Sequence, residues 1–203
     1  MTNYIKEVFD AATLAQAKNI VLTDDPNNPN KFIVETKFLI DVVSKKDIIH
    51  SESIVLDFGC GMGRVSKHLV DTFDCKVIGV DISNSMRQFA NHYVGNATKF
   101  ETMESYNNPN SIDVCFSIFV LQHVQHPKEA ISNICSSLKP GGWLVLVNEP
   151  VRFVPGDVDA NRYVIWKDDG FDIFGEIETR LTKVSSVKYM NLQHDVIFYR
   201  KSE

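Results

Sequence analysis

The sequence predicts an α/β fold, a three-layer αβα sandwich whose mostly parallel sheet ends in an antiparallel hairpin at the C-terminus. Two observations predict the parallel sheet. From residue 53 onward short apolar runs alternate with amphipathic helical patterns, and the apolar runs are near-continuous in Val, Ile and Leu. Such runs are typical of strands that helices bury on both faces. A third observation predicts the hairpin, because its two strands are joined by a connection too short for parallel pairing.

The N-terminal part of the chain is expected to be helical. Apolar residues recur at helical spacing from Tyr4 to Ala15 and again from Phe32 to Val43. A loop rich in Asp, Asn and Pro, residues 24–30, separates the two patterns. Residues 1–50 are therefore predicted to form a helical extension or lid.

The alternating elements follow in order. Strands are predicted at residues 54–56, 77–80, 98–101, 114–120 and 143–147, and the terminal hairpin at residues 184–190 and 196–200. Helices are predicted on the apolar face that runs from Val65 to Phe73, over residues 84–93, and from Pro127 to Leu138. A proline is harmless in the first turn of a helix, where its missing N–H has no partner to lose.

Composition excludes several classes of protein. Of the 203 residues, 44% are hydrophobic and 23% are charged, as in an ordinary globular domain rather than a disordered or fibrous chain. No apolar run approaches the roughly 18 residues of a membrane-spanning helix, and charges interrupt the N-terminus where a signal peptide would be apolar. We therefore expect a cytoplasmic protein with no membrane partner. The net charge of -5, without a long basic cluster, argues against a nucleic-acid partner.

No metal site is expected. His123 and His126 form an H-x-x-H pair, but no third ligand lies nearby and Pro127 begins a helix at once. The cysteines are scattered without a C-x-x-C pair, and each lies beside or within an apolar stretch. We expect all four to be free, buried thiols.

The segment V-L-D-F-G-C-G-M-G-R places Gly59, Gly61 and Gly63 between the first predicted strand and its helix. Glycines there let the backbone turn sharply and let a ligand lie against the main chain. The helix that follows offers unpaired N–H groups and the positive end of its dipole, which suit a carboxylate or a phosphate equally well. A purely structural glycine turn is the alternative interpretation.

Asp81 ends the second predicted strand, where an acid of a βαβ unit can accept hydrogen bonds from both hydroxyls of a ribose. An ordinary helix N-cap is the alternative, but the glycine loop and this acid in tandem predict a nucleoside ligand. The loop reads G-x-G-x-G, whereas a dinucleotide site typically reads G-x-G-x-x-G. Asp57, just before the loop, would repel a pyrophosphate but could orient water or accept a hydrogen bond from an ammonium group.

Between about Ile54 and Val147 the sequence resembles the class I S-adenosylmethionine-dependent methyltransferases. D-F-G-C-G-M-G-R resembles the first motif of that family, and Asp81 resembles its ribose-binding acid. D-V-C-F-S-I-F-V-L-Q-H-V (113–124) resembles its fourth-strand motif, and L-K-P-G-G-W-L-V-L-V (138–147) its helix-to-fifth-strand motif. The resemblance implies a seven-stranded sheet, S-adenosyl-L-methionine as the cofactor and S-adenosyl-L-homocysteine as the product.

The resemblance also implies which residues hold each part of the cofactor. Asp57, Gly59, Gly61 and the neighbouring main chain, which includes Cys60 and Gly63, would hold the methionine part, and Asp81 the ribose. Ile82, Met86, Met103 and Glu104 would surround the adenine, and Ser117 and Phe119 would line the sulfonium side. Met86 and Met103 are equally consistent with core filling. Arg64 would pair either with the carboxylate of the cofactor or with a surface acid.

We expect one methyltransferase domain over residues 1–203. In this scheme residues 51–150 form the cofactor-binding core behind the N-terminal extension, residues 151–182 cover the acceptor, and residues 183–203 form the terminal hairpin.

Methyl transfer from a sulfonium is an in-line displacement with an activated leaving group, so alignment and exclusion of water are the main tasks. Orientation alone lowers a barrier by about 7–11 kcal/mol, while a general base typically adds about 10²–10⁴-fold. A base is needed only where the acceptor must lose a proton. His123, just beyond the fourth strand, and Glu149, after the fifth, are the candidate bases. Packing or capping in its loop is the alternative role for His123.

The acceptor is expected to be a small molecule that offers an O, N or C nucleophile. The fourth strand lacks the Asn/Asp-Pro-Pro-aromatic motif of enzymes that methylate amide or base nitrogens. Aromatic residues between residues 151 and 182 suit a small apolar or cationic acceptor, although they could equally pack the last helix on the sheet. Arg152, Tyr163 and Trp166 are the candidate acceptor contacts.

Two other functions compete with this interpretation. One is a non-catalytic protein that binds S-adenosylmethionine. The other is an NAD(P)-dependent oxidoreductase, which the glycine spacing and the lack of a separate substrate domain disfavour.

Overall fold

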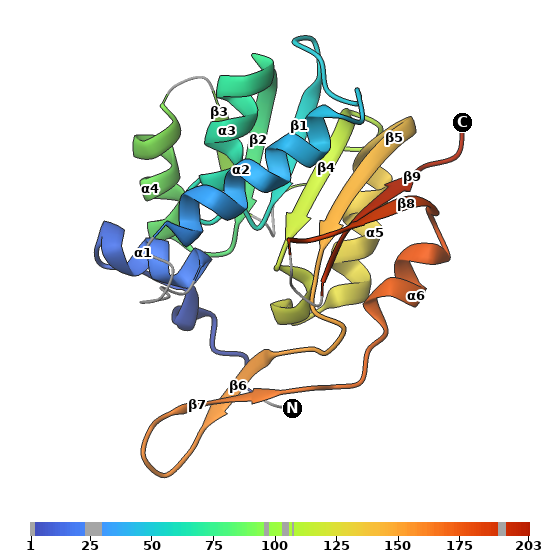
Figure 1. Cartoon of the computed structure of the whole chain (residues 1–203). Helices are drawn as coiled ribbons and strands as arrows, with labels where there is room; N and C mark the ends of the chain where they lie inside the picture. Colours follow the sequence, from blue (N-terminus) through green and yellow to red (C-terminus); the bar gives the residue numbers. More distant parts are fainter. Residues whose placement is uncertain (1–2, 23–29, 96–97, 103–105, 107, 191–193) are drawn as a thin grey trace.

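A seven-stranded sheet in the order β3-β2-β1-β4-β5-β9-β8 forms the centre of the computed structural model (Figure 1). The structure describes residues 3–22, 30–95, 98–102, 106, 108–190 and 194–203. The strands are β1 (Ile54–Phe58), β2 (Lys76–Asp81), β3 (Thr98–Thr102), β4 (Ile112–Ile118), β5 (Leu138–Val147), β8 (Thr182–Lys188) and β9 (Asp195–Arg200). Strands β1 to β5 pair in parallel, while β9 is antiparallel to both β5 and β8. The predicted mostly parallel sheet with its C-terminal antiparallel hairpin is confirmed.

Helices cover both faces of this sheet and complete the three layers. α2 (Lys31–Ser44) and α3 (Arg64–Phe73) share one apolar core with β1, β2, β4, β5 and β9. α5 (Pro127–Ser137) and α6 (Ile173–Glu178) share the other core with the opposite face of the same strands. α4 (Asn84–Val94) packs beside α3, against β2 and β3. Burying a single leucine or valine side chain in such a core contributes about 1.5–3 kcal/mol.

The N-terminal segment differs from the single helix predicted over residues 4–15. A short 3-10 helix, η1 (Lys6–Phe9), is followed by extended chain and then by α1 (Leu14–Val21). Thr13 Oγ1 accepts a hydrogen bond from the Gln16 N–H at 3.2 Å, and Gln16 Oε1 accepts one from the Thr13 N–H at 3.2 Å. This reciprocal capping box begins a new helix at Leu14.

Several strand boundaries also differ from the prediction, by two residues at β1 and β8 and more clearly at β4 and β5. The apolar run from Val114 to Val120 leaves the strand after Ile118, because Phe119 adopts a left-handed backbone with φ of 57°. β5 begins at Leu138, which the helical pattern of the sequence includes in the preceding helix, because Leu138 pairs with Ile112 of β4.

Residues 151–182 contain a hairpin that the sequence did not predict. Strands β6 (Val154–Val158) and β7 (Val164–Lys167) form a separate two-stranded sheet that extends from the body of the molecule (Figure 1). Tyr4 forms an antiparallel bridge with Gly156, and the Ile5 N–H donates to the Pro155 carbonyl at 3.0 Å. The hairpin is thereby joined to the N-terminal segment.

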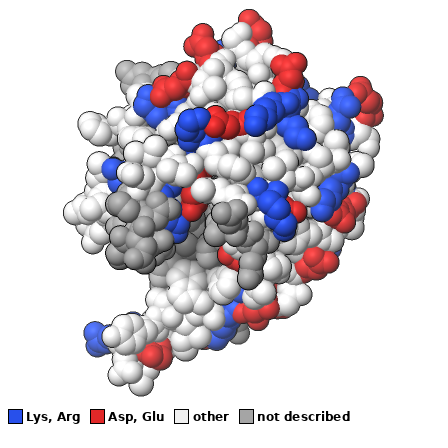
Figure 2. All heavy atoms as spheres, viewed as in Figure 1, with Lys and Arg blue, Asp and Glu red and all other residues white. Residues whose placement is uncertain are grey.

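The remaining global expectations concern thiols, charge and membrane spans. All four cysteines are free and buried, as predicted. Figure 2 shows basic and acidic side chains interspersed over the upper part of one face rather than gathered in one basic patch. Within the described ranges, no helix has the length and apolar character needed to cross a membrane.

Candidate active site

A cavity of about 340 Å³ opens at the edge of the sheet where β1, β2 and β4 end. Gly59, Gly61 and Asp81 line it from the sheet, and Ile82 and Met86 line it from the turn after β2 and from α4. Further lining comes from the N-terminal segment, the loop after β4 and the start of α5: Tyr4, Phe9, Ile20, Val21, Phe119, Val120, His123, His126, Glu129 and Asn133. Ligands of open α/β sheets bind at this edge, beyond the carboxyl ends of the strands.

The three glycines of the loop after β1 all have positive φ angles, 77° at Gly59, 54° at Gly61 and 84° at Gly63. Gly63 does not line the cavity. A Cβ atom at Gly63 would lie 2.6 Å from a Val94 methyl group, so this glycine allows α3 and α4 to approach. A Cβ atom at Gly61 would lie 2.7 Å from a methyl group of Val21, and one at Gly59 would collide with Val120. Two valine side chains therefore cover the glycine main chain.

Asp81 stands at the tip of β2, with 8% of its surface exposed. One carboxylate oxygen accepts from the Gly61 N–H at 2.8 Å and the other from the Ser83 N–H at 2.9 Å. Burial raises the pKa of this carboxyl, and the two N–H donors and the Arg87 charge oppose that rise. A carboxylate has about four lone-pair sites, so Asp81 can fix the glycine loop and still accept from a ligand hydroxyl.

Asp57 lies behind the glycine loop rather than in the cavity. Its buried carboxylate accepts from the Ser66 hydroxyl at 2.6 Å and from the Ser66 N–H at 3.1 Å, which fixes the first turn of α3. Burial raises the pKa of Asp57 to about 6. Asp57 therefore supports the loop, and the structure does not bring it to the cavity surface as the resemblance implied.

The raised pKa of Asp57 predicts a pH-dependent stability. Between the unfolded value of 3.8 and the folded value of about 6, the folded state holds the proton more tightly. We therefore expect the free energy of unfolding to fall by about 3 kcal/mol from this group as pH rises through that interval. Urea unfolding between pH 4 and 6.5 should show a larger fall in the wild type than in Asp57→Asn, in which the raised pKa of Asp81 still contributes. Asp113→Asn, at the opposite edge of the sheet, is the control, and a pH profile unchanged by Asp57→Asn would contradict the assignment.

His123 is half-buried in the short 3-10 helix η2 (Leu121–His123) and lines the cavity. Its Nδ1 lies 2.8 Å from the Phe153 carbonyl oxygen. Because a carbonyl can only accept, Nδ1 carries the proton and Nε2 presents a lone pair. The rings of Phe9 and Trp166 lie 5.7 and 5.5 Å from the His123 ring. Burial lowers the pKa of His123 below 6.5, which keeps the imidazole neutral at pH 7.

Arg152 does not contact the cavity, which corrects its assignment as an acceptor contact. The side chain is 1% exposed, and it forms a bidentate pair with Asp169 at 3.0 and 2.9 Å. Its other N–H groups donate to the carbonyls of Leu121 and Val124, both at 2.7 Å. The guanidinium thus holds the loop that carries His123. Its N–H groups point into the protein and not into the cavity.

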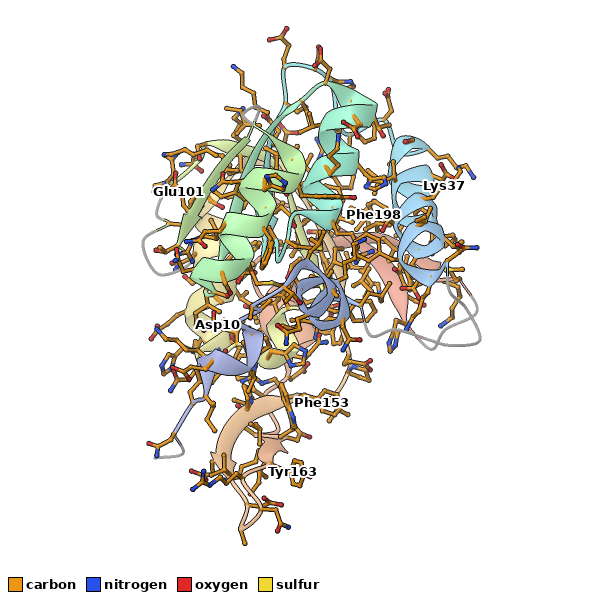
Figure 3. All side chains as sticks on the ribbon, turned by 90° about the vertical axis from the view of Figure 1, so that its left-hand side faces the viewer. Asp10, Lys37, Glu101, Phe153, Tyr163 and Phe198 are labelled. Carbon is orange, nitrogen blue, oxygen red and sulfur yellow. The ribbon has the colours of Figure 1, made fainter. Side chains whose placement is uncertain are left out.

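The other predicted residues lie at varied distances from the cavity. Tyr163 is 72% exposed at the far end of the hairpin, well away from Phe153 and the body (Figure 3). Trp166 packs on Phe9 and His123, behind the cavity wall. Glu149 pairs with His194 Nε2 at 3.2 Å and does not line the cavity. Cys60 and Ser117 are buried, with Ser117 Oγ lacking a partner, and Met103 and Glu104 lie outside the described residues.

Arg64 was predicted to pair with the carboxylate of the cofactor or with a surface acid. The side chain is 3% exposed, and it donates to Thr36 Oγ1 at 2.9 Å. Its guanidinium also lies 5.9 Å from the centre of the Phe32 ring, and its Nε has no partner. The surface-acid pairing is therefore wrong.

The sequence interpretation missed most of the far wall of the cavity. Tyr4, Phe9, Ile20 and Val21 come from the N-terminal segment, whose amphipathic pattern showed only that one side is buried. His126 and Glu129 come from the start of α5. The motif Thr-x-x-Gln at Thr13 is typical of the start of a helix, and it could have indicated that this segment divides into two helices. Within the described part of the chain, no group of three or more His, Cys, Asp or Glu could hold a metal ion.

Comparison with known proteins identifies the family. The model of a family described as a methyltransferase domain matches residues 56–146. A phosphoethanolamine N-methyltransferase of Triticum aestivum is 30% identical over 172 residues, which cover 81% of this chain and 32% of that protein. A ubiquinone biosynthesis O-methyltransferase of Paraburkholderia phymatum is 31% identical over 97 residues, 44% of this chain and 41% of that protein. The PH0226 protein of Pyrococcus horikoshii shares the fold, with a TM-score of 0.67 at 18% identity over 86% of this chain and 93% of that chain.

Residues 56–146 therefore belong to the methyltransferase domain family, and the chain has the fold of the class I S-adenosylmethionine-dependent methyltransferases. It spans a third or less of the length of the curated relatives that it matches first. The matched region, residues 56–146, contains the glycine loop, Asp81 and His123.

The residues of this methyltransferase fit S-adenosylmethionine. Asp81 and the Gly61 main chain meet in one cavity with Ile82 and Met86, which supply acceptors for ribose hydroxyls and apolar walls for a base. Gly59 also lines the cavity, but its Cα is covered by Val120. The amino-acid part of the cofactor can reach the glycine main chain only after Val21 and Val120 shift.

Removing the Asp81 carboxylate should weaken cofactor binding in this methyltransferase. A hydrogen bond to a charged group contributes about 1.5–3 kcal/mol, so Asp81→Ala should raise the Kd for S-adenosylhomocysteine about 10- to 150-fold in calorimetric titration. Asp81→Asn keeps one oxygen acceptor, and with it at most one of the Gly61 and Ser83 contacts, so its Kd should rise less than that of Asp81→Ala. Asp113→Asn is the control, and wild-type affinity in Asp81→Ala would mean that the ribose binds elsewhere.

Proposed function

We propose that this chain is an active enzyme that transfers the methyl group of S-adenosylmethionine in line to an O, N or C nucleophile of a small-molecule acceptor. One observation supports the proposal above all others. A single cavity joins the candidate cofactor contacts, Gly61 and Asp81, to His123 and the aromatic side chains of Tyr4 and Phe9. Cofactor and acceptor can therefore bind next to each other in the same cavity.

The N-terminal segment supports the exclusion of water from this cavity. One end is held to the β6–β7 hairpin by the bridge between Tyr4 and Gly156. The other end is held to the β2–α4 turn, because Asp10 accepts from the Ser83 hydroxyl at 2.6 Å and Ser85 Oγ accepts from the Ala11 N–H at 2.9 Å. Because the N-terminal segment is held at both ends, Phe9 is positioned over the cavity.

The chemistry divides between the cofactor and this chain. S-adenosylmethionine supplies the methyl group and a leaving group that needs no further activation. The chain holds the ribose with Asp81, orients the acceptor beside Phe9 and His123, and keeps water away. His123 Nε2 accepts a proton where the acceptor nucleophile carries one. Alignment supplies most of the acceleration, which is consistent with the lack of a catalytic triad among the motifs of the sequence.

The name of the wheat relative specifies N-methylation of phosphoethanolamine. We do not extend this acceptor to the present chain, because Arg152 is turned toward Asp169 and two carbonyls and Arg162 lies exposed in the turn between β6 and β7, outside the cavity lining. A phosphate group would need such a cation within the cavity.

A two-stage assay tests the proposed function. Calorimetric titration should show binding of S-adenosylhomocysteine and none of NADH, and incubation of the enzyme with methyl-labelled S-adenosylmethionine and a metabolite extract should give a labelled small molecule. Binding without a labelled product would identify a non-catalytic binding protein and contradict the enzymatic assignment. Failure to bind S-adenosylhomocysteine would overturn both.

A further inference from the structure

We propose that the acceptor is an uncharged phenol, whose hydroxyl oxygen receives the methyl group, and not a phosphorylated or carboxylated molecule. This inference rests on the proposed function and names the substrate class of the same cavity. Three features of the chain support the inference: the charges that face the cavity, the hydrogen bonds that the nearby arginines already form within the protein, and the hydrogen bond of His123.

The fixed charges that face the cavity are negative. Among the lining residues that the structure describes, Asp81 and Glu129 are the residues with a permanent charge, and both are carboxylates. The residues outside the description, 1–2, 23–29, 96–97, 103–105, 107 and 191–193, include no lysine or arginine. An anionic group on the acceptor would lose its hydration and meet carboxylates instead of a counter-charge.

The arginines around the site already donate hydrogen bonds to other groups of the protein. Arg152 donates four hydrogen bonds, to Asp169 and to the carbonyls of Leu121 and Val124. Arg64 donates to Thr36 and lies over the Phe32 ring, behind the glycine loop. Arg87 donates to the Asp81 carbonyl at 2.5 Å and to Asn84 at 3.3 Å. Arg152 and Arg87 would have to break internal hydrogen bonds before they could receive a phosphate or carboxylate, and Arg64 is buried outside the lining of the cavity.

His123 indicates a nucleophile that must lose a proton. Its Nδ1–H is used by the Phe153 carbonyl, so Nε2 is the acceptor that remains. A neutral hydroxyl can donate a hydrogen bond to this lone pair and pass its proton to it during the transfer.

The aromatic surroundings of His123 favour a flat ring. Phe9 is tilted by 52° to the His123 ring, and Trp166 stands at 67° to His123 and 73° to Phe9. Phe9 and Tyr4 face the cavity while Trp166 supports Phe9 and His123 from behind. An acceptor ring can continue this edge-to-face packing, which aromatic rings prefer.

The step balances without a further reactant. The new O–CH₃ bond forms as the S–CH₃ bond breaks, and the electron pair of that bond remains on sulfur as a neutral thioether. The phenol O–H bond breaks and its proton passes to His123 Nε2, which later releases it to water.

The test compares acceptors that differ mainly in charge. Catechol and protocatechuate share a dihydroxyphenyl ring, and only protocatechuate carries a carboxylate; phosphoethanolamine serves as the phosphorylated amine. With methyl-labelled S-adenosylmethionine, kcat/KM should be about 100-fold higher for catechol than for protocatechuate or phosphoethanolamine. Phe9→Arg, which adds a cation beside His123, should shift this ratio at least tenfold toward protocatechuate, and Phe9→Leu should not.

The outcomes separate this inference from the proposed function. Equal or faster methylation of protocatechuate or phosphoethanolamine overturns the phenol assignment and leaves the methyltransferase assignment standing. No product from catechol, in a protein that binds S-adenosylhomocysteine and labels a compound in the metabolite extract, also overturns the phenol assignment. If the wild-type protein does not bind S-adenosylhomocysteine, the proposed function itself is wrong.

Discussion

Arg152→Ala should lower the free energy of unfolding by about 2–4 kcal/mol, because a buried acceptor left without its donor costs about 1–3 kcal/mol, while Asp169, whose side chain is 45% exposed, can be rehydrated. The substitution leaves Asp169 without its bidentate partner and leaves the carbonyls of Leu121 and Val124 without donors. Arg152→Lys should recover only part of the loss, because one ammonium cannot span a carboxylate and two carbonyls in the fixed geometry of a guanidinium. Chemical denaturation monitored by circular dichroism measures both effects.

Arg162→Ala is the matched control for this prediction. Arg162 lies exposed in the turn between β6 and β7, and truncation of such a side chain should change stability by less than about 0.5 kcal/mol. If Arg152→Ala were as stable as Arg162→Ala, the buried clamp would not exist in solution. Because Leu121 and Val124 flank His123, Arg152→Lys should also lower turnover more than it lowers affinity for S-adenosylhomocysteine.

His123→Ala should lower kcat about 10²- to 10⁴-fold for a phenolic acceptor, the contribution of a general base. The affinity for S-adenosylhomocysteine should remain unchanged, because the candidate ribose contact is Asp81. His126→Ala is the control, since His126 also lines the cavity but lies beyond the loop that Arg152 clamps. Steady-state kinetics with catechol, together with calorimetric titration, gives both readouts.

The pH profile adds a second readout for His123. A general base acts when deprotonated, so the rate should rise with pH through the pKa of His123, which burial holds below 6.5, and level off near neutrality. His123→Ala should abolish that rise. An equal loss of kcat in His126→Ala, or a profile unaffected by His123→Ala, would contradict the assignment of the base.

The sequence was sufficient for the parts of the fold that depend on local pattern. The parallel strands are continuous apolar runs, and the glycine loop has its own backbone requirement, which the positive φ angles of Gly59 and Gly61 satisfy. Asp81 was predictable because it follows directly from the end of β2. These features depend on neighbours in the chain, which the sequence displays.

The remainder depends on contacts between distant segments. From the sequence alone, Arg152 could be an acceptor-binding residue. The fold instead places Asp169 and the carbonyls of Leu121 and Val124 against it. The β6–β7 hairpin contains Pro155 in a strand, which is unfavourable without an edge position, and the bridge from Tyr4 to Gly156 decides its place. The valines that cover the glycine main chain come from α1 and from the residue after Phe119, and spacing does not relate them.

The central claim is that the carboxylate at the tip of β2 and the glycine loop hold an adenosyl cofactor. A crystal structure of the protein with S-adenosylhomocysteine tests it most directly. The ribose hydroxyls should lie within hydrogen-bonding distance of the Asp81 carboxylate, the amino-acid part should lie along Gly59 and Gly61, and Val21 and Val120 should have shifted. An adenosyl group bound outside this cavity, or Val21 and Val120 still packed on the glycines with the ligand bound, would contradict the account.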